Sequence, residues 1–215
     1  MNRMPLFITA AGFLVAVFVA AALVYQSQKT GTAQVQARQA LLVRAHAPTA
    51  GPADARVHIV EFLDPACETC ASFYPFVKRM MAASPGRIRV SIRYAPFHDN
   101  SVEVVKVLEA ARKQGKYWEA LEALLATQSR WAPNHSPQLD LVWGQLAGLG
   151  LDLERVRQDM HGADIGRIVE QDVADAKALN VTKTPEFFVN GRPMPSFGYE
   201  QLATLVSEAL ATEYR

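Results

Sequence analysis

Residues Val57–Cys70, which read VHIVEFLDPACETC, decide the fold. The first seven are almost all β-branched, aromatic or aliphatic, and this composition predicts a buried strand. Apolar residues then recur at helical spacing from Phe73 to Met81, so a helix should begin at the cysteines. The Cys67-Glu68-Thr69-Cys70 motif is therefore predicted to lie at the N-terminus of a helix, directly after a strand.

This position favours a negative charge on Cys67. The first backbone N–H groups of a helix have no intrahelical partners, and together with the helix dipole they stabilise an anion. The thiolate is the nucleophile of thiol–disulfide exchange, and its pKa falls in C-x-x-C motifs at helix starts. Cys70 follows one turn later and can close a disulfide with Cys67. The motif thus predicts redox catalysis by these two cysteines, and we expect no cofactor.

Other interpretations of the cysteine pair compete with redox chemistry. A structural zinc site is disfavoured because the chain has only two cysteines and no H-x3-5-H pattern to complete four ligands. A purely structural disulfide across two residues would remove little chain entropy. Two interpretations stay open: a module that holds Cu(I) with its two thiolates, and a docking domain without catalysis.

The composition describes a chain that can fold on its own. With 215 residues, 50% of them hydrophobic, it can bury a full core and suits one domain with an elaboration. The formal net charge is +1, and no polybasic cluster is present. These features argue against nucleic acid as a partner.

Residues 6–25 form a nearly uninterrupted apolar stretch, long enough to cross a bilayer as a helix. The stretch is longer than the apolar core of a cleavable signal peptide. We therefore predict an uncleaved membrane anchor within residues 1–28, while the small residues Ala20–Ala22 keep cleavage open. The lipid bilayer would be a partner through residues 6–25.

Basic residues on both sides of this stretch leave its orientation undecided by the positive-inside rule. A cysteine pair that cycles through a disulfide fits an oxidising compartment. We therefore expect a single-pass protein of the inner (cytoplasmic) membrane, with its catalytic domain in the periplasm or cell exterior.

The remaining chain divides into four segments. Residues 29–50 are polar and rich in Ala and Gln, as in a spacer, and a turn-rich entry precedes residue 51. Residues 51–98 read strand, helix, strand, and residues 99–179 read as successive amphipathic helices. In residues 180–215, Asn190-Gly191 predicts a hairpin, and a final helix follows. The predicted order is β-α-β, a helical insert, then β-β-α.

This pattern resembles the thioredoxin fold, and specifically the DsbA-like family, in which a helical domain interrupts the fold. Four features carry the resemblance: Cys67-x-x-Cys70 after a buried strand, Pro75 in the following helix, the helical insert, and Thr184-Pro185 before the late strand. The resemblance covers Gly51 to the C-terminus. It implies an α/β thioredoxin fold with an all-helical insertion, next to the predicted transmembrane helix.

The resemblance also implies a function and further site residues. The protein would exchange disulfides with the cysteines of client proteins, and a membrane redox partner would recycle it. Pro185 would be a cis-proline facing the cysteines, and the backbone of Thr184 would pair with an extended client segment. Glu61 aligns with the family's buried acidic residue and could accept the proton of Cys70. The alternative for Glu61 is a solvated carboxylate.

Glu68 and Thr69, between the cysteines, are expected to tune the redox chemistry. The negative charge of Glu68 should raise the pKa of Cys67, whereas the helix N-terminus lowers it. The disulfide should then be less oxidising than in strong oxidases, whose motif carries a histidine. An acidic residue here also resembles reductases dedicated to cytochrome c maturation, so oxidase, reductase and isomerase all stay open. His98, in the loop after the second strand, could approach the site, but a hydrogen-bonded loop histidine is the favoured interpretation.

Overall fold

The computed structural model describes Gln26 and residues 35–215, and Leu41–Arg215 form one compact unit. The predicted anchor, residues 6–25, lies outside the described residues. Within those residues, no helix combines the length and apolar character needed to cross a membrane.

A five-stranded sheet forms the centre of the compact unit, in the order β1-β3-β2-β4-β5. β2 and β3 are parallel, and the other three pairings are antiparallel. The strands span Thr49–Ala50 (β1), Val57–Leu63 (β2), Ile88–Tyr94 (β3), Glu186–Val189 (β4) and Arg192–Pro193 (β5). β2 is central and buried along its whole length, as its apolar sequence predicts.

Alternation along β2 divides the core into two layers, because successive side chains point to opposite faces of a sheet. Val57, Ile59 and Leu63 join the larger apolar cluster, which also contains both cysteines. Val60 and Phe62 join a smaller cluster on the opposite face. By this alternation, Glu61 lies on the face that carries the cysteine helix.

The cysteine helix, α2 (Glu68–Ala83), continues through Pro75 without a break. It shares its face of the sheet with the C-terminal helix α9 (Tyr199–Glu213), whose Tyr199 ring stacks on Phe73 at 4.2 Å between centroids. The hairpin before α9 turns at Asn190 and Gly191, and both have positive φ angles, as a two-residue hairpin requires.

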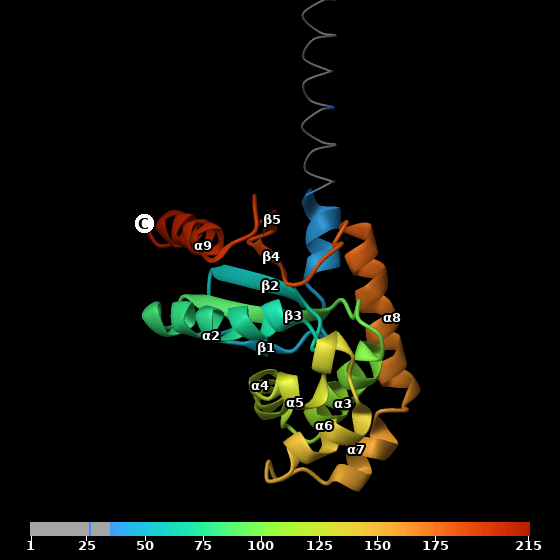
Figure 1. The fold of residues 1–215 in the computed structure, drawn as a ribbon. Helices are drawn as coiled ribbons and strands as arrows, with labels where there is room; N and C mark the ends of the chain where they lie inside the picture. The colour runs from blue at the N-terminus through green and yellow to red at the C-terminus, as the bar shows by residue number, and fades with distance from the viewer. Residues whose placement is uncertain (1–25, 27–34) are drawn as a thin grey trace, which may run out of the picture. The chain divides into compact units, whose positions relative to one another are not determined.

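The helical insert extends from one end of the sheet (Figure 1). Apolar stripes at helical spacing bury its helices against one another and against Tyr94 of β3. Its elements are α3 (Ser101–Lys113), α4 (Tyr117–Ala126), α5 (Gln128–Trp131), the 3-10 turn η1 (Pro133–His135), α6 (Leu139–Leu146), α7 (Leu153–Asp159) and α8 (Ala163–Ala178).

Buried charges fasten α8 and the segment after Leu41 to the sheet. The guanidinium of Arg93 is fully buried and donates to Asp172 at 2.8 Å and to Asp175 at 2.6 Å. It also donates to the backbone carbonyl of Leu41 at 2.6 Å. Arg44 adds a two-bond ion pair with Asp175. These contacts hold the start of the compact unit, at Leu41, against the sheet.

The observed order of elements is the predicted one. The β-α-β unit, the helical insert and the closing β-β-α unit all form, and together they are a thioredoxin-like α/β fold with a helical insertion.

Candidate active site

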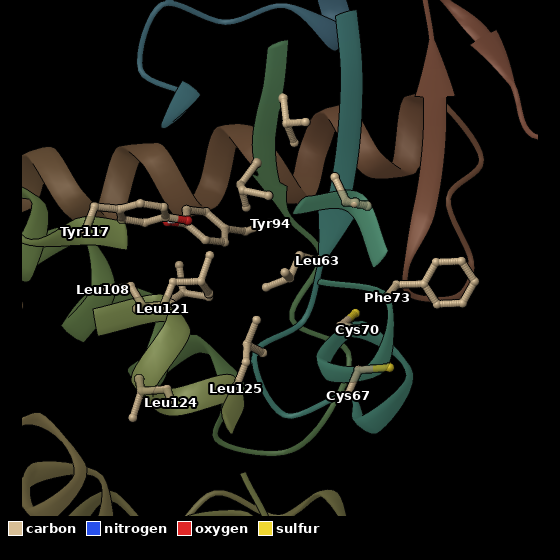
Figure 2. Close-up of a cluster of buried hydrophobic side chains, with 14 of the residues drawn as sticks. Leu63, Cys67, Cys70, Phe73, Tyr94, Leu108, Tyr117, Leu121, Leu124 and Leu125 are labelled. Carbon is tan, nitrogen blue, oxygen red and sulfur yellow. The ribbon is translucent and has the colours of Figure 1, made fainter. Parts of the chain in front are cut away.

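The two cysteines lie at the start of α2, at the end of the sheet that meets the insert. β2 ends at Leu63, and Cys67 occupies the N-cap position of α2 with an extended backbone. Figure 2 shows the two cysteine side chains at the start of the helix. Both thiols are free: Cys67 is 7% exposed and Cys70 is 0% exposed. The site therefore offers one slightly exposed sulfur and one fully buried sulfur.

Several donors around Cys67 favour its thiolate. A hydrogen bond from the thiol of Cys70 lowers the pKa of Cys67 most, followed by one from the Thr184 side chain and by the backbone N–H groups of Cys70 and Thr69. These outweigh the opposing effect of burial and lower the pKa of Cys67 to about 5. A thiol at this pKa is mostly ionised at neutral pH.

Glu68 and Thr69 lie between the cysteines. The side chain of Glu68 is solvent-exposed, where water screens its charge, and its effect on the pKa of Cys67 stays a prediction. Thr69 contributes through its backbone N–H, which helps to lower the pKa of Cys67. The Cys70 thiol, followed by the Thr184 side chain and these backbone groups, therefore favours the thiolate of Cys67.

Cys70 has the opposite character. Burial raises the pKa of its thiol well above the usual value, and the interaction with Cys67 and the charge of Glu61 raise it further. The two cysteines are therefore unlike: Cys67 is prepared as a nucleophile, whereas Cys70 holds its proton until something takes it away.

Glu61 is fully buried in the middle of β2, paired with Ile92 on one side and Phe187 on the other. Burial in this apolar surrounding, together with the charge of Cys67, raises the pKa of Glu61 to about 8. Its Oε1 atom has no hydrogen-bond partner among the described residues. The solvated alternative for Glu61 is therefore wrong, and a buried carboxyl group lies within electrostatic range of both sulfurs.

Thr184 and Pro185 meet the cysteine pair from the other half of the fold. The Thr184-Pro185 peptide bond is cis, as the family resemblance implied, and β4 begins at the next residue. The Sγ atom of Cys67 lies 3.3 Å from the backbone carbonyl oxygen of Thr184. The insert of some eighty residues thus leaves these two distant segments of sequence in direct contact.

A buried aspartate that the sequence analysis did not single out organises the loop before the cysteines. Asp64 is 0% exposed, and its carboxylate accepts from the backbone N–H of Ala66 at 2.8 Å and from the hydroxyl of Ser101 at 2.7 Å. It also accepts from the backbone N–H groups of Phe97 and His98. Asp64 therefore fixes the turn before Cys67 to the first helix of the insert. In the sequence, the Asp64-Pro65 dipeptide after the strand is a pattern that indicates such a turn.

His98 is held in its loop by two side-chain contacts. Its Nδ1 atom lies 2.7 Å from a carboxylate oxygen of Asp64, and its ring stacks on His135 of the insert at 4.9 Å between centroids. The Nδ1 atom of His135 lies 3.4 Å from the backbone carbonyl of Ala66, the residue before Cys67. Asn134 and His135 both have positive φ angles, which are uncommon for residues other than glycine. No local sequence pattern predicted that η1 would lie beside the residue before Cys67.

The described residues contain no group of three or more His, Cys, Asp or Glu side chains arranged to hold a metal ion. The groups that the site brings together are two sulfurs and one buried carboxyl group.

Replacing Glu61 tests its raised pKa through stability. A carboxyl group whose folded pKa is raised contributes stability below its unfolded pKa, near 4.5, and that stability is lost as pH rises through about 8. Glu61→Gln removes this loss. Between pH 4.5 and pH 8, the free energy of unfolding of the variant should therefore rise by roughly 2–4 kcal/mol relative to that of the wild type. Denaturant unfolding of the reduced proteins measures the difference. Glu170→Gln, at an exposed position of α8, is the matched control, and an equal change in both variants would contradict the assignment.

Comparisons with known proteins agree with this geometry. A family model described as thioredoxin matches residues 44–208. The crystal structure of a thioredoxin-like oxidoreductase from Silicibacter pomeroyi DSS-3 is 28% identical with a TM-score of 0.70, over 81% of this chain and 98% of that one. Oxidised BdbD from Bacillus subtilis shares the fold at 21% identity with a TM-score of 0.67, over 77% of this chain and 94% of that one.

A curated relative of a different kind also matches. The Na(+)/H(+) antiporter NhaA of Herminiimonas arsenicoxydans is 31% identical over 159 residues, which are 74% of this chain and 25% of the antiporter. The chain thus spans about a quarter of that relative, and the match carries no inference of ion transport. The thioredoxin model, by contrast, covers most of the chain, and the cysteine pair, insert and cis-proline follow the order that the resemblance implied. The chain belongs to the thioredoxin family.

Proposed function

We propose that this protein is a thiol–disulfide oxidoreductase that exchanges disulfides with the cysteines of client proteins through Cys67 and Cys70. The single observation that carries the proposal is the contrast between the two sulfurs: the pKa of Cys67 is lowered to about 5, whereas that of Cys70 is raised. Such a pair supplies an attacking thiolate on the slightly exposed sulfur and a reserved thiol on the fully buried one.

The chemistry follows in two exchange steps. In the reductive direction, the Cys67 thiolate attacks a client disulfide, a Cys67–client disulfide forms, and one client thiolate leaves. Cys70 then loses its proton to Glu61 and attacks the Sγ atom of Cys67, which releases the second client thiolate. Two electrons pass to the client, and Cys67 and Cys70 become a disulfide. The reverse sequence oxidises a client dithiol.

The oxidative direction is the one that the thiolate favours. Stabilising the Cys67 thiolate stabilises the reduced protein, so the disulfide becomes a stronger oxidant. Each pKa unit below the solution pH adds about 30 mV to the reduction potential. We therefore propose that the protein donates disulfides to clients and that a second redox protein reoxidises it.

The surface around the site suits an unfolded or extended client. The backbone of the half-buried Thr184, next to Pro185, can pair with a client strand, while exposed rings offer apolar contact. Phe197 is 42% exposed and Tyr199 is 43% exposed, and both rings pack on Phe73 of the cysteine helix. These features support proteins, rather than small molecules, as the clients.

We further propose that residues 6–25 anchor the protein in the inner membrane, with the catalytic domain on the oxidising side and a membrane protein as its redox partner. The length and apolar character of that stretch support the anchor, and the redox-active cysteine pair supports the compartment. A reporter enzyme that works only outside the cytoplasm should be active when it is fused after Arg215. Activity only of a cytoplasmic reporter at the same position would contradict this topology.

Trapping clients tests the proposed chemistry. In Cys70→Ser the Cys67 thiolate can still form the mixed disulfide, but the resolving thiol is missing. Mixed disulfides with client proteins should therefore accumulate in cells and disappear on treatment with dithiothreitol, as non-reducing gels would reveal. The matched control is Cys67→Ser, which should trap nothing. Equal adduct formation by both variants, or none by either, would contradict the proposal.

A further inference from the structure

A cavity of about 300 Å³ lies between α2, the sheet and α4. Glu61 forms part of its lining, whereas neither cysteine does. The rest of the wall is mostly apolar and comes from four elements: Ala50 of β1, Val90 and Ile92 of β3, Tyr74, Val77 and Met81 of α2, and Trp118 of α4. Glu61 thus borders this space and also interacts with both cysteines.

The cavity reaches solvent beside an ion pair. Lys78 of α2 donates to both carboxylate oxygens of Glu122 of α4, each at 2.9 Å, and both residues line the cavity. Their side chains are 51% and 54% exposed. Solvent therefore reaches the wall at the Lys78–Glu122 pair, whereas another part of the wall is the fully buried carboxyl group of Glu61.

The proposed chemistry makes a demand on Glu61 that the redox face does not meet. The pKa of Glu61 is raised to about 8, so at neutral pH Glu61 must first lose its own proton to act as a base. Each resolving step then moves one proton from the Cys70 thiol to the Glu61 carboxylate, and that proton must leave before the next turnover. On the redox side, Cys70 is 0% exposed and Cys67 is 7% exposed, so the two cysteines give Glu61 little access to solvent. The cavity supplies the missing contact with solvent.

We propose that this cavity is the passage through which the Glu61 carboxyl group exchanges its proton with bulk water during disulfide exchange. The inference deepens the proposed function and rests on it. In the balanced step, Cys70–SH and the Glu61 carboxylate become a thiolate and a carboxylic acid. The thiolate displaces the client sulfur from Cys67, and the acid passes its proton to water in the cavity.

The size and polar groups of the cavity suit water. A water molecule occupies about 30 Å³ of liquid and needs two to four polar partners, so a short chain of molecules fits. The unpartnered Oε1 atom of Glu61 offers one partner at the inner end, and the Tyr74 hydroxyl and the Lys78–Glu122 pair offer others further out.

Several titratable groups surround Glu61 and bear on the pH dependence of this exchange. They are Cys67, Cys70, Tyr74 and Lys78 of α2, and Tyr117 and Glu122 of α4. In the mixed disulfide Cys67 carries no charge, so its contribution to the raised pKa of Glu61 disappears. The carboxylate is then more available as a base at the step that requires one.

Filling the cavity tests the passage. Ala50 is half-buried on β1 and lines the cavity, so Ala50→Phe should place a ring inside it. Ellman's reagent separates the two steps on the reduced full-length protein: Cys67 releases the first thionitrobenzoate, and attack by Cys70 releases the second. We expect the second phase to slow by about tenfold or more, with the first phase unchanged. A second filling variant, Met81→Phe, should act in the same way.

The controls distinguish failure of this inference from failure of the proposed function. Ala53→Phe makes the same change three residues later at an exposed position outside the cavity, and should leave both phases as in the wild type. Glu61→Gln should slow the second phase, and adding Ala50→Phe to it should cause no further loss. If the second phase ran at the wild-type rate in both filling variants but was slow in Glu61→Gln, the proposed passage would be wrong and the proposed function would stand. A first phase as slow as that of an ordinary thiol would instead overturn the proposed function.

Discussion

The interaction on which this structure depends is the stabilisation of one sulfur by hydrogen-bond donors at the start of a helix. Cys67 occupies the N-cap of α2, where backbone N–H groups lack helical partners, and the Cys70 thiol and Thr184 side chain add to them. The same site sets the character of the other groups. The Cys67 charge and burial together hold the proton on Glu61, and burial keeps the proton on Cys70. Ionisation of Cys67 therefore goes together with a protonated Cys70 and a protonated Glu61.

The rest of the fold keeps this arrangement in place by joining segments that are distant in sequence. Thr184 arrives beside Cys67 after the entire helical insert. Asp64 ties the loop before Cys67 to α3, and the buried contacts of Arg93 with Asp172 and Asp175 tie α8 to the sheet. Buried charges of this kind are held by mutual pairing, and losing one partner leaves the other unpaired in the core. The insert is thus fastened at both of its ends to the elements that carry the cysteines.

Sequence reasoning predicted the features that depend on local pattern. The apolar run before Cys67 became a buried strand, the following apolar spacing became α2, and Asn190-Gly191 formed the hairpin turn. The cis bond before Pro185 came only from the family resemblance, since a proline at a strand start does not by itself require it.

What local pattern could not predict depends on tertiary contact. Nothing near Asp64 in the sequence indicates that its carboxylate meets Ser101, and nothing near His135 indicates stacking on His98. The segment after Leu41 reads as polar spacer because its partners, Arg93 and the aspartates of α8, lie far along the chain. Likewise, the exposure of the Glu68 side chain to water cannot be read from its proximity to Cys67 in the sequence.

The central claim is that Cys67 is a thiolate at neutral pH, and the pH dependence of its alkylation tests this most directly. The reduced protein would be treated with iodoacetamide over a series of pH values, with the modified residue identified by mass spectrometry. The account predicts that the rate at Cys67 reaches half its maximum near pH 5, because the donors around it lower its pKa to about 5. A midpoint near about 8.5, the value of an unperturbed cysteine, would contradict it.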